Sequence, residues 1–152
     1  MIYNYLEYQA KIIRTKFVSD KAYLTKRFIC KLGYTPDFCS PKSFNEKVTA
    51  RMIFERSPLF TKLADKCAVR QLVSAKVGDA YFVPLIGIYK CIDEIDFNQL
   101  PNQFVLKCTH DSGSAMVCLD KSTFNIEKAT AKIKNHLKMN MYFRKREWHY
   151  KD

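Results

Sequence analysis

The sequence predicts an α+β fold, with a helical amino-terminal region over residues 1–78 and a region over residues 79–152 that contains mostly antiparallel strands. In the first region, apolar residues recur at helical spacing between capping residues. In the second region, short runs of β-branched and aromatic residues take over, and a polar loop joins two of them. A length of 152 residues and a hydrophobic content of 47% are enough for one folded domain with a sizeable core.

Three helices are expected in the first 55 residues. Residues 1–17 have the pattern of a basic amphipathic helix, which packs on its own domain more often than it lies on a membrane surface. Ser19 is suited to cap a second helix, and Gly33 to end it in the left-handed conformation. After a linker with two prolines over residues 35–42, Ser43–Glu46 has capping-box spacing and starts the third helix.

A short turn and a longer helix complete the first region. Ser57 and Pro58 start the turn, because proline is suited to a first helical position. Asp65 is suited to cap a helix that ends at Gly78. Lys66 then lies at the start of that helix, where a lysine gains nothing from the helix dipole. This unfavourable position indicates a ligand nearby.

The second region contains three runs of β type and one helix. Residues 81–89 form an apolar run in which Pro84 indicates an edge or a break. After an acidic connection, residues 104–107 form a β-rich run that ends in a lysine, and residues 115–119 form a second run. Asn125 is suited to cap a final helix with one apolar face.

The loop between residues 107 and 115 is the most informative part of the chain. Gly113 leaves backbone N–H groups uncovered, the hydroxyls of Ser112 and Ser114 are compact donors, and Lys107 supplies the positive charge that an oligophosphate needs. The pattern indicates a phosphate-binding loop, and an ordinary hairpin turn stays open as the alternative. Because residues 110–114 have few apolar side chains to bury, we expect this loop to be mobile without a ligand.

The formal net charge of +11 indicates a polyanionic partner, for which nucleotide phosphates, nucleic acid and anionic lipid all qualify. The basic residues are spread along the chain without the basic and aromatic interleaving of an RNA-binding sheet, so no nucleic acid partner is expected. No apolar run approaches the roughly 20 residues of a membrane span, and no secretory signal is evident. We therefore expect a cytoplasmic protein with at most peripheral membrane contact.

Six cysteines without a CxxC pair indicate reduced thiols in such a compartment. Cys108, His110 and Cys118 could gather on one face of the hairpin, which leaves a zinc site open as an alternative, although no fourth ligand follows at a usual spacing. A nucleophilic Cys–His pair would need an orienting third group, and none is identified. No metal ligand and no catalytic residue is therefore assigned.

Five segments occur in order along the chain: Ser43–Lys47, Pro58–Arg70, Leu100–Cys108, His110–Ser114 and Arg146–Trp148. Together they resemble the amino-terminal part of the TupA-like ATP-grasp family, which is found in bacterial gene clusters for teichuronic acid, capsule and other surface polysaccharides. Members of this family are often labelled glycosyltransferases. Several ordered motifs at family-like spacing are far more specific than one glycine loop.

The resemblance implies a nucleotide site. In ATP-grasp enzymes two lysines contact ATP phosphates, one at an Asp-Lys helix start and one at the end of a Phe-Val-Leu-Lys strand, and a flexible hairpin covers the phosphates. The resemblance assigns ATP binding to the following residues: Lys66, Lys107, His110, Ser112, Gly113 and Ser114. The two lysines are expected to converge on one cleft.

The resemblance further implies an incomplete ATP-grasp fold. In the family, a strand that holds adenine follows the matched part, and later carboxylates and an asparagine bind magnesium. The implied cofactors are ATP and Mg²⁺, with the Mg²⁺ ligands outside this chain. Trp148 and Tyr150 are expected to be exposed or poorly packed beside the open nucleotide cleft.

The implied function is the amino-terminal part of an ATP-dependent ligase or transferase of surface-polysaccharide synthesis, in the cytoplasm or at the inner face of the membrane. Such enzymes phosphorylate a carboxylate and pass the acyl group to a nucleophile, and we expect this chain alone to be inactive. Its expected partners are a nucleotide and a sugar or polysaccharide precursor. Two alternatives stay open: a sugar-nucleotide glycosyltransferase, and a truncated interaction module without catalysis.

Overall fold

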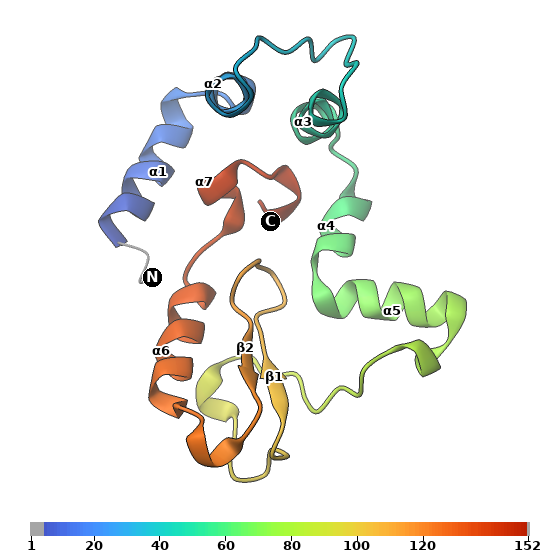
Figure 1. The fold of residues 1–152 in the computed structure, drawn as a ribbon, viewed down its shortest axis with the longest axis vertical. Helices are drawn as coiled ribbons and strands as arrows, with labels where there is room; N and C mark the ends of the chain where they lie inside the picture. The colour runs from blue at the N-terminus through green and yellow to red at the C-terminus, as the bar shows by residue number, and fades with distance from the viewer. Residues whose placement is uncertain (1–4, 152) are drawn as a thin grey trace. The chain divides into compact units, whose positions relative to one another are not determined.

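The computed structural model describes residues 5–151 and has an α+β fold (Figure 1). It is mostly helical, and its described residues contain one antiparallel sheet of two strands. The chain divides into two compact units, the first with residues up to Thr61 and from Met141 onward, the second with Lys62–Asn140. The helix expected before Gly78 therefore groups with the hairpin. The division into functional regions at residues 78 and 79 stays a prediction.

The first unit is built from helices. They are α1 (Tyr5–Phe17), α2 (Asp20–Leu32), α3 (Phe44–Phe54) and α7 (Met141–Lys145), with a 3-10 turn, η4 (Trp148–Tyr150), while α4 (Pro58–Ala64) has residues in both units. The predicted caps of α2 are confirmed, because the Ser19 hydroxyl accepts from the Ala22 N–H and Gly33 adopts a φ of +78°. α1 packs against α7 and buries Tyr8, which confirms that it packs on its own domain. The first four residues of the predicted amphipathic helix lie outside the described residues.

The core of the first unit lies between α2 and α3. Leu24 and Phe28 of α2 pack with Ala50 and Ile53 of α3 and with Phe38 of the linker, and all five are buried. The ring of Phe28 meets that of Phe38 edge to face, with the ring centres 5.8 Å apart. The linker between the two helices is therefore fixed by an aromatic side chain.

Arg146 attaches the residues after α7 to the start of α2. Its side chain is 2% exposed, and Nη1 donates to Asp20 Oδ1 at 2.8 Å and to the Val18 carbonyl at 3.1 Å. The Tyr142 hydroxyl donates to the same carboxylate oxygen at 3.0 Å. Removing one partner of a buried ion pair leaves an uncompensated charge, so this contact fixes the end of the described chain within the first unit.

Glu46 organises the start of α3 through the predicted capping box. The Glu46 N–H donates to the Ser43 hydroxyl at 3.1 Å, and the Ser43 N–H donates back to Glu46 Oε2 at 2.8 Å. The Lys42 N–H donates to the same oxygen at 3.0 Å, and the Asp37 N–H donates to Oε1 at 3.2 Å. One buried carboxylate thus holds both the helix start and the linker before it.

The second unit combines helices with the hairpin. Its elements are α5 (Lys66–Val77), η1 (Asp79–Tyr81), η2 (Ile92–Glu94), β1 (Phe104–Leu106), β2 (Met116–Cys118), η3 (Lys121–Thr123) and α6 (Ile126–Leu137). Asp65 caps α5 by accepting from the Cys67 and Ala68 N–H groups, and Asn125 caps α6 by accepting from the Lys128 N–H. Both caps confirm the sequence prediction.

The strand register gives the hairpin one buried and one exposed face. Phe104 pairs with Cys118 and both are buried, whereas Val105 pairs with Val117 and both are more than half exposed. Ile92, Cys108 and Ile133 form a buried cluster with partly buried side chains from the same unit. The hairpin is therefore anchored through one face.

The predicted β-type run over residues 81–89 is wrong. Tyr81 ends η1, and residues 83–89 have no regular secondary structure. Their side chains are exposed, with Val83 at 82% and Ile88 at 63%. A strand needs a neighbour to satisfy its backbone groups, and no strand lies beside this run in the described part of the chain. Pro84, which has no N–H to donate, further weakens such pairing.

No helix within residues 5–151 combines the length and the apolar character that a membrane crossing requires.

The Glu46 network makes stability depend on pH. Hydrogen bonds from the N–H groups of Ser43, Asp37 and Lys42 lower the pKa of Glu46 from 4.5 to about 2, although desolvation opposes them. A carboxyl whose folded pKa is depressed stabilises the fold above its unfolded pKa and loses that contribution as pH falls through the folded value. We therefore expect Glu46→Gln to reduce the loss of unfolding free energy between about pH 6 and about pH 3.

Urea unfolding at the two pH values measures this difference. Glu127→Gln is the matched control, because Glu127 is exposed and has no hydrogen-bond or ion-pair partner in the described chain. An equal pH dependence in wild type and Glu46→Gln would show that the carboxylate network does not act as described.

Candidate functional site

The loop between β1 and β2 lies at one end of the hairpin, with α6 beside it (Figure 1). Lys132 of α6 donates from Nζ to the carbonyl of Ala115 at 2.9 Å. The ring of His136, in the last turn of α6, reaches Asp111 at the centre of the loop. α6 therefore supports the loop directly.

Asp111 is the internal anchor of the loop, with an exposure of 3%. Its Oδ1 accepts from the Ser114 hydroxyl at 2.6 Å, and its Oδ2 accepts from His136 Nδ1. The Ser114 oxygen in turn accepts from the Cys108 N–H at 2.9 Å. A continuous chain of hydrogen bonds thus runs from α6 to the end of β1.

Lys66 holds the loop from the other side. It is the first residue of α5, and its N–H donates to the Thr109 carbonyl at 3.2 Å. Its Nζ donates to the same carbonyl at 3.1 Å and also to the carbonyl of Asp111. These bonds explain why a lysine is tolerated at this helix start, and they bring Lys66 to the predicted loop.

Asp65, next to Lys66, is ionised in this arrangement. Burial raises its pKa, but hydrogen bonds from the Ala68 N–H, the Thr109 side chain and the Cys67 N–H outweigh that effect and lower it. The start of α5 and the loop are therefore connected through both residues of the Asp-Lys pair.

Three groups of donors remain at the surface of the loop. Lys107 directly follows β1, is exposed and has no hydrogen-bond or ion-pair partner in the described chain. The N–H groups of Ser112 and Gly113 also have no acceptor there, and both residues are exposed. Gly113 has a φ of +96°, which a residue with a side chain rarely adopts. Uncovered N–H groups and an unpaired ammonium group on the same loop can receive an anion.

Ser114 and His110, which were also predicted to bind ATP, have surroundings that differ from those of the exposed donors. Ser114 is 1% exposed, and its hydroxyl is occupied by Asp111 and Cys108, so it is a structural part of the loop and not an available donor. His110 is half-buried without a hydrogen-bond partner in the described chain. The convergence of Lys66 and Lys107 on one cleft stays a prediction.

The expectation that residues 110–114 are mobile without a ligand stays a prediction. Asp111 and Ser114 are buried and hydrogen-bonded, whereas Ser112 and Gly113 at the tip are exposed. Sequence reasoning did not assign Asp111 or His136, because 25 positions separate them and nothing in either local pattern points to the other.

The residues considered for zinc do not form a metal site. Within residues 5–151, no group of three or more His, Cys, Asp and Glu side chains is placed to hold a metal ion. All six cysteines are free thiols, as predicted, and Cys108 and Cys118 are buried. Burial raises the pKa of the Cys108 thiol, which keeps it protonated and unreactive.

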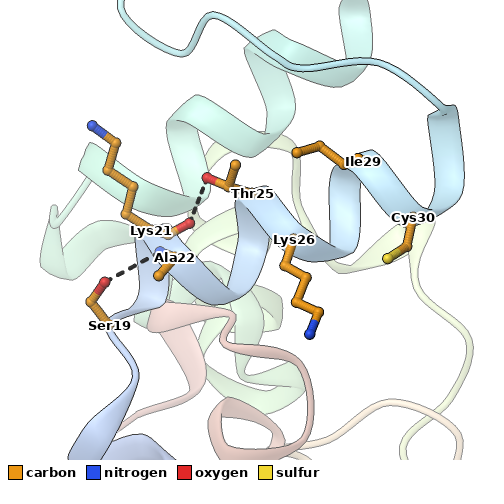
Figure 2. A pocket seen from close by; sticks show the side chains of 7 residues that line it. All are labelled: Ser19, Lys21, Ala22, Thr25, Lys26, Ile29 and Cys30. Carbon is orange, nitrogen blue, oxygen red and sulfur yellow. Dashed lines mark hydrogen bonds between the residues drawn. The ribbon is translucent and has the colours of Figure 1, made fainter.

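Two hollows lie in the first unit, and no predicted site residue lines either of them. One, of about 500 Å³, runs along α2 and is lined by residues of that helix and its cap, as Figure 2 shows: Ser19, Lys21, Ala22, Thr25, Lys26, Ile29 and Cys30. The other, of about 430 Å³, is lined by Val48, Arg51, Met52, Glu55, Phe60, Glu147, Trp148 and His149. Because a single helix supplies every residue of the first hollow, it is an open groove.

Trp148 and Tyr150 are half-buried, so neither is as exposed as predicted. The guanidinium of Arg56 lies 5.2 Å from the centre of the Trp148 ring, within the range of a cation–π contact. The ring of Tyr150 lies tilted against that of His149, with the ring centres 4.5 Å apart. The aromatic end of the chain thus has partners inside the first unit.

The internal role of Ser114 gives a stability prediction. Ser114→Ala leaves the buried Cys108 N–H without its acceptor and Asp111 Oδ1 without its donor, and we expect a loss of about 1–3 kcal/mol in unfolding free energy. Ser112→Ala is the matched control, because its exposed hydroxyl makes no such bond, and it should change stability by less than about 0.5 kcal/mol. Equal effects of the two substitutions in urea unfolding would contradict the assigned network.

Comparison with known proteins agrees with the motifs. A family model described as TupA-like ATPgrasp matches residues 46–152, which include α5, the hairpin, α6 and the residues after it. Comparisons with curated proteins and with solved structures gave no match. The matched part covers most of the chain and contains the whole loop with its three exposed donors. The chain belongs to the TupA-like ATP-grasp family.

Proposed function

We propose that this chain binds the phosphates of ATP at the tip of the β1–β2 loop. The N–H groups of Ser112 and Gly113 would donate to phosphate oxygens, and Lys107 would neutralise their charge. The observation that carries the proposal is that these donors are left without acceptors, whereas Asp111, Ser114 and the Cys108 N–H are hydrogen-bonded to one another. A site whose donors are already placed loses little conformational entropy on binding.

Lys66 supports the same site by a different contact. Its ammonium group donates to the Thr109 and Asp111 carbonyls, so it fixes the backbone on either side of His110. It also brings a second positive charge to the loop. In this proposal Lys66 shapes the loop and contributes to its potential, and Lys107 contacts the nucleotide directly.

The described residues suit ATP phosphates but not magnesium. Exposed N–H groups and an unpaired lysine match the acceptor oxygens of a phosphate chain. For Mg²⁺, which prefers carboxylate and other oxygen ligands, no suitable cluster of side chains occurs within residues 5–151, and the buried Asp111 is already occupied. We therefore propose that the chain binds ATP without turning it over, as part of an incomplete ATP-grasp module.

The wider role is that of the family. We propose that the chain is the amino-terminal part of an ATP-dependent ligase or transferase in bacterial surface-polysaccharide synthesis, whose other partner is a sugar or polysaccharide precursor. This role places it in the cytoplasm, with at most peripheral membrane contact. A sugar-nucleotide glycosyltransferase is the second candidate, since Lys107 could equally neutralise the diphosphate of a nucleotide sugar.

Replacing Lys107 tests the site directly. Lys107→Ala removes an exposed cation that has no hydrogen-bond or ion-pair partner in the described chain, so the fold should be unchanged while the dissociation constant for ATP rises by at least about tenfold. Isothermal titration calorimetry with ATP, with and without magnesium chloride, measures the affinity. Lys128→Ala is the matched control, because it removes the same charge from an exposed position on α6.

Three results would each overturn a part of the proposal. Equal ATP affinity in wild type and Lys107→Ala would remove Lys107 from the site. Tighter binding of a nucleotide sugar than of ATP, lost in Lys107→Ala, would favour the glycosyltransferase. Release of ADP from ATP by the purified chain would show that it carries a magnesium site and catalysis of its own.

A further inference from the structure

His136 makes a contact to which the proposed function assigns no role. Its side chain is 14% exposed and lies in the last turn of α6, 25 positions from Asp111 in sequence. Because an ionised carboxylate only accepts hydrogen bonds, the His136 Nδ1–H is the donor to Asp111 Oδ2. The ring therefore supplies the buried Asp111 carboxylate with a hydrogen-bond donor from outside the loop.

Within residues 5–151, three side chains of α6 make polar contacts with other parts of the second unit, and these contacts support different groups. Lys134 pairs with Asp93 of η2 at 2.8 Å, where both groups are well exposed. Lys132 donates to one carbonyl at the end of the loop. Of these three side chains, only His136 contacts the Asp111 carboxylate. That carboxylate accepts from the Ser114 hydroxyl, whose oxygen in turn accepts from the Cys108 N–H.

We infer that His136 is a positioning residue for phosphate binding, an inference that rests on the proposed function. With the Nδ1–H in place, Asp111 stays buried and its charge is held away from the loop surface. Without it, a buried carboxylate keeps only the Ser114 hydroxyl and the cost of its burial rises sharply.

Loss of the His136 donor would weaken ATP binding in two ways. An Asp111 side chain that turns toward water releases Ser114, so the backbone over residues 108–114 loses its support and the N–H groups of Ser112 and Gly113 lose their placement. The same movement brings a negative charge toward the phosphates, which repels them. Both effects weaken ATP binding, although His136 does not contact the nucleotide.

The test compares two substitutions of the same residue. His136→Leu removes the donor, and we expect the ATP dissociation constant to rise about tenfold or more, with faster deuterium uptake across residues 107–116. His136→Asn places an amide N–H near the original Nδ1–H, and we expect an affinity within about threefold of wild type and uptake close to it. Calorimetry and hydrogen–deuterium exchange give the two readouts.

Lys134→Met is the matched control, because it removes a polar contact of α6 that does not reach the loop, and it should leave both readouts unchanged. If His136→Leu does not fold, His136→Ala carries the test, since it also removes the imidazole donor and adds no other. Its expected changes have the same direction as those of His136→Leu.

The outcomes separate this inference from the proposed function. If His136→Leu binds ATP as wild type does while Lys107→Ala does not, His136 has no positioning role and the phosphate site stands. Failure of the Asn variant to restore affinity would show that ring packing matters and not the hydrogen bond, which also overturns the inference. If wild type itself binds no ATP, the proposed function is wrong, and unchanged loop uptake in His136→Leu would further show that His136 does not hold the loop.

Discussion

The burial of the Asp111 carboxylate is the constraint on which the candidate site depends. A charged group with 3% exposure is stable only if its oxygens are hydrogen-bonded, and the two donors come from different parts of the second unit. Ser114 provides one from within the loop, and His136 provides the other from α6. The carboxylate therefore connects a helix to a hairpin loop that has little apolar surface with which to pack.

The same requirement determines which groups remain for a ligand. The hydroxyl of Ser114 and the ammonium of Lys66 are both used inside the protein, whereas Lys107 and the N–H groups of Ser112 and Gly113 are not. A loop supported on both sides presents its donors with less conformational freedom than an unsupported turn. This arrangement separates residues that build the site from residues that are left to contact an anion.

Local sequence patterns predicted the helices well because helix caps are formed by residues that are close together in the sequence. The Ser19 and Asp65 caps and the Ser43–Glu46 capping box each involve residues within four positions, and all are present as predicted. The hairpin was also predictable, since a polar loop with a glycine lies between two β-rich runs. The fold class followed from these elements, and the family followed from the resemblance of five ordered motifs.

What the sequence did not predict depends on contacts between residues that are far apart in the sequence. The run over residues 81–89 has strand-like composition, yet composition does not supply the neighbouring strand that it lacks. Ser114 has the character of a phosphate donor, and its internal role follows only from the approach of Asp111 and the Cys108 N–H. The contact of His136 depends on how α6 packs, which no local pattern specifies.

The central claim is that the chain binds an anion at the tip of the β1–β2 loop. Titration of the ¹⁵N-labelled protein with ATP, followed by amide chemical shifts in two-dimensional NMR, tests it residue by residue. We expect the largest shifts at Ser112 and Gly113, with α2 and its groove unchanged. Shifts concentrated along α2 or around Trp148, with an unaffected loop tip, would contradict the account.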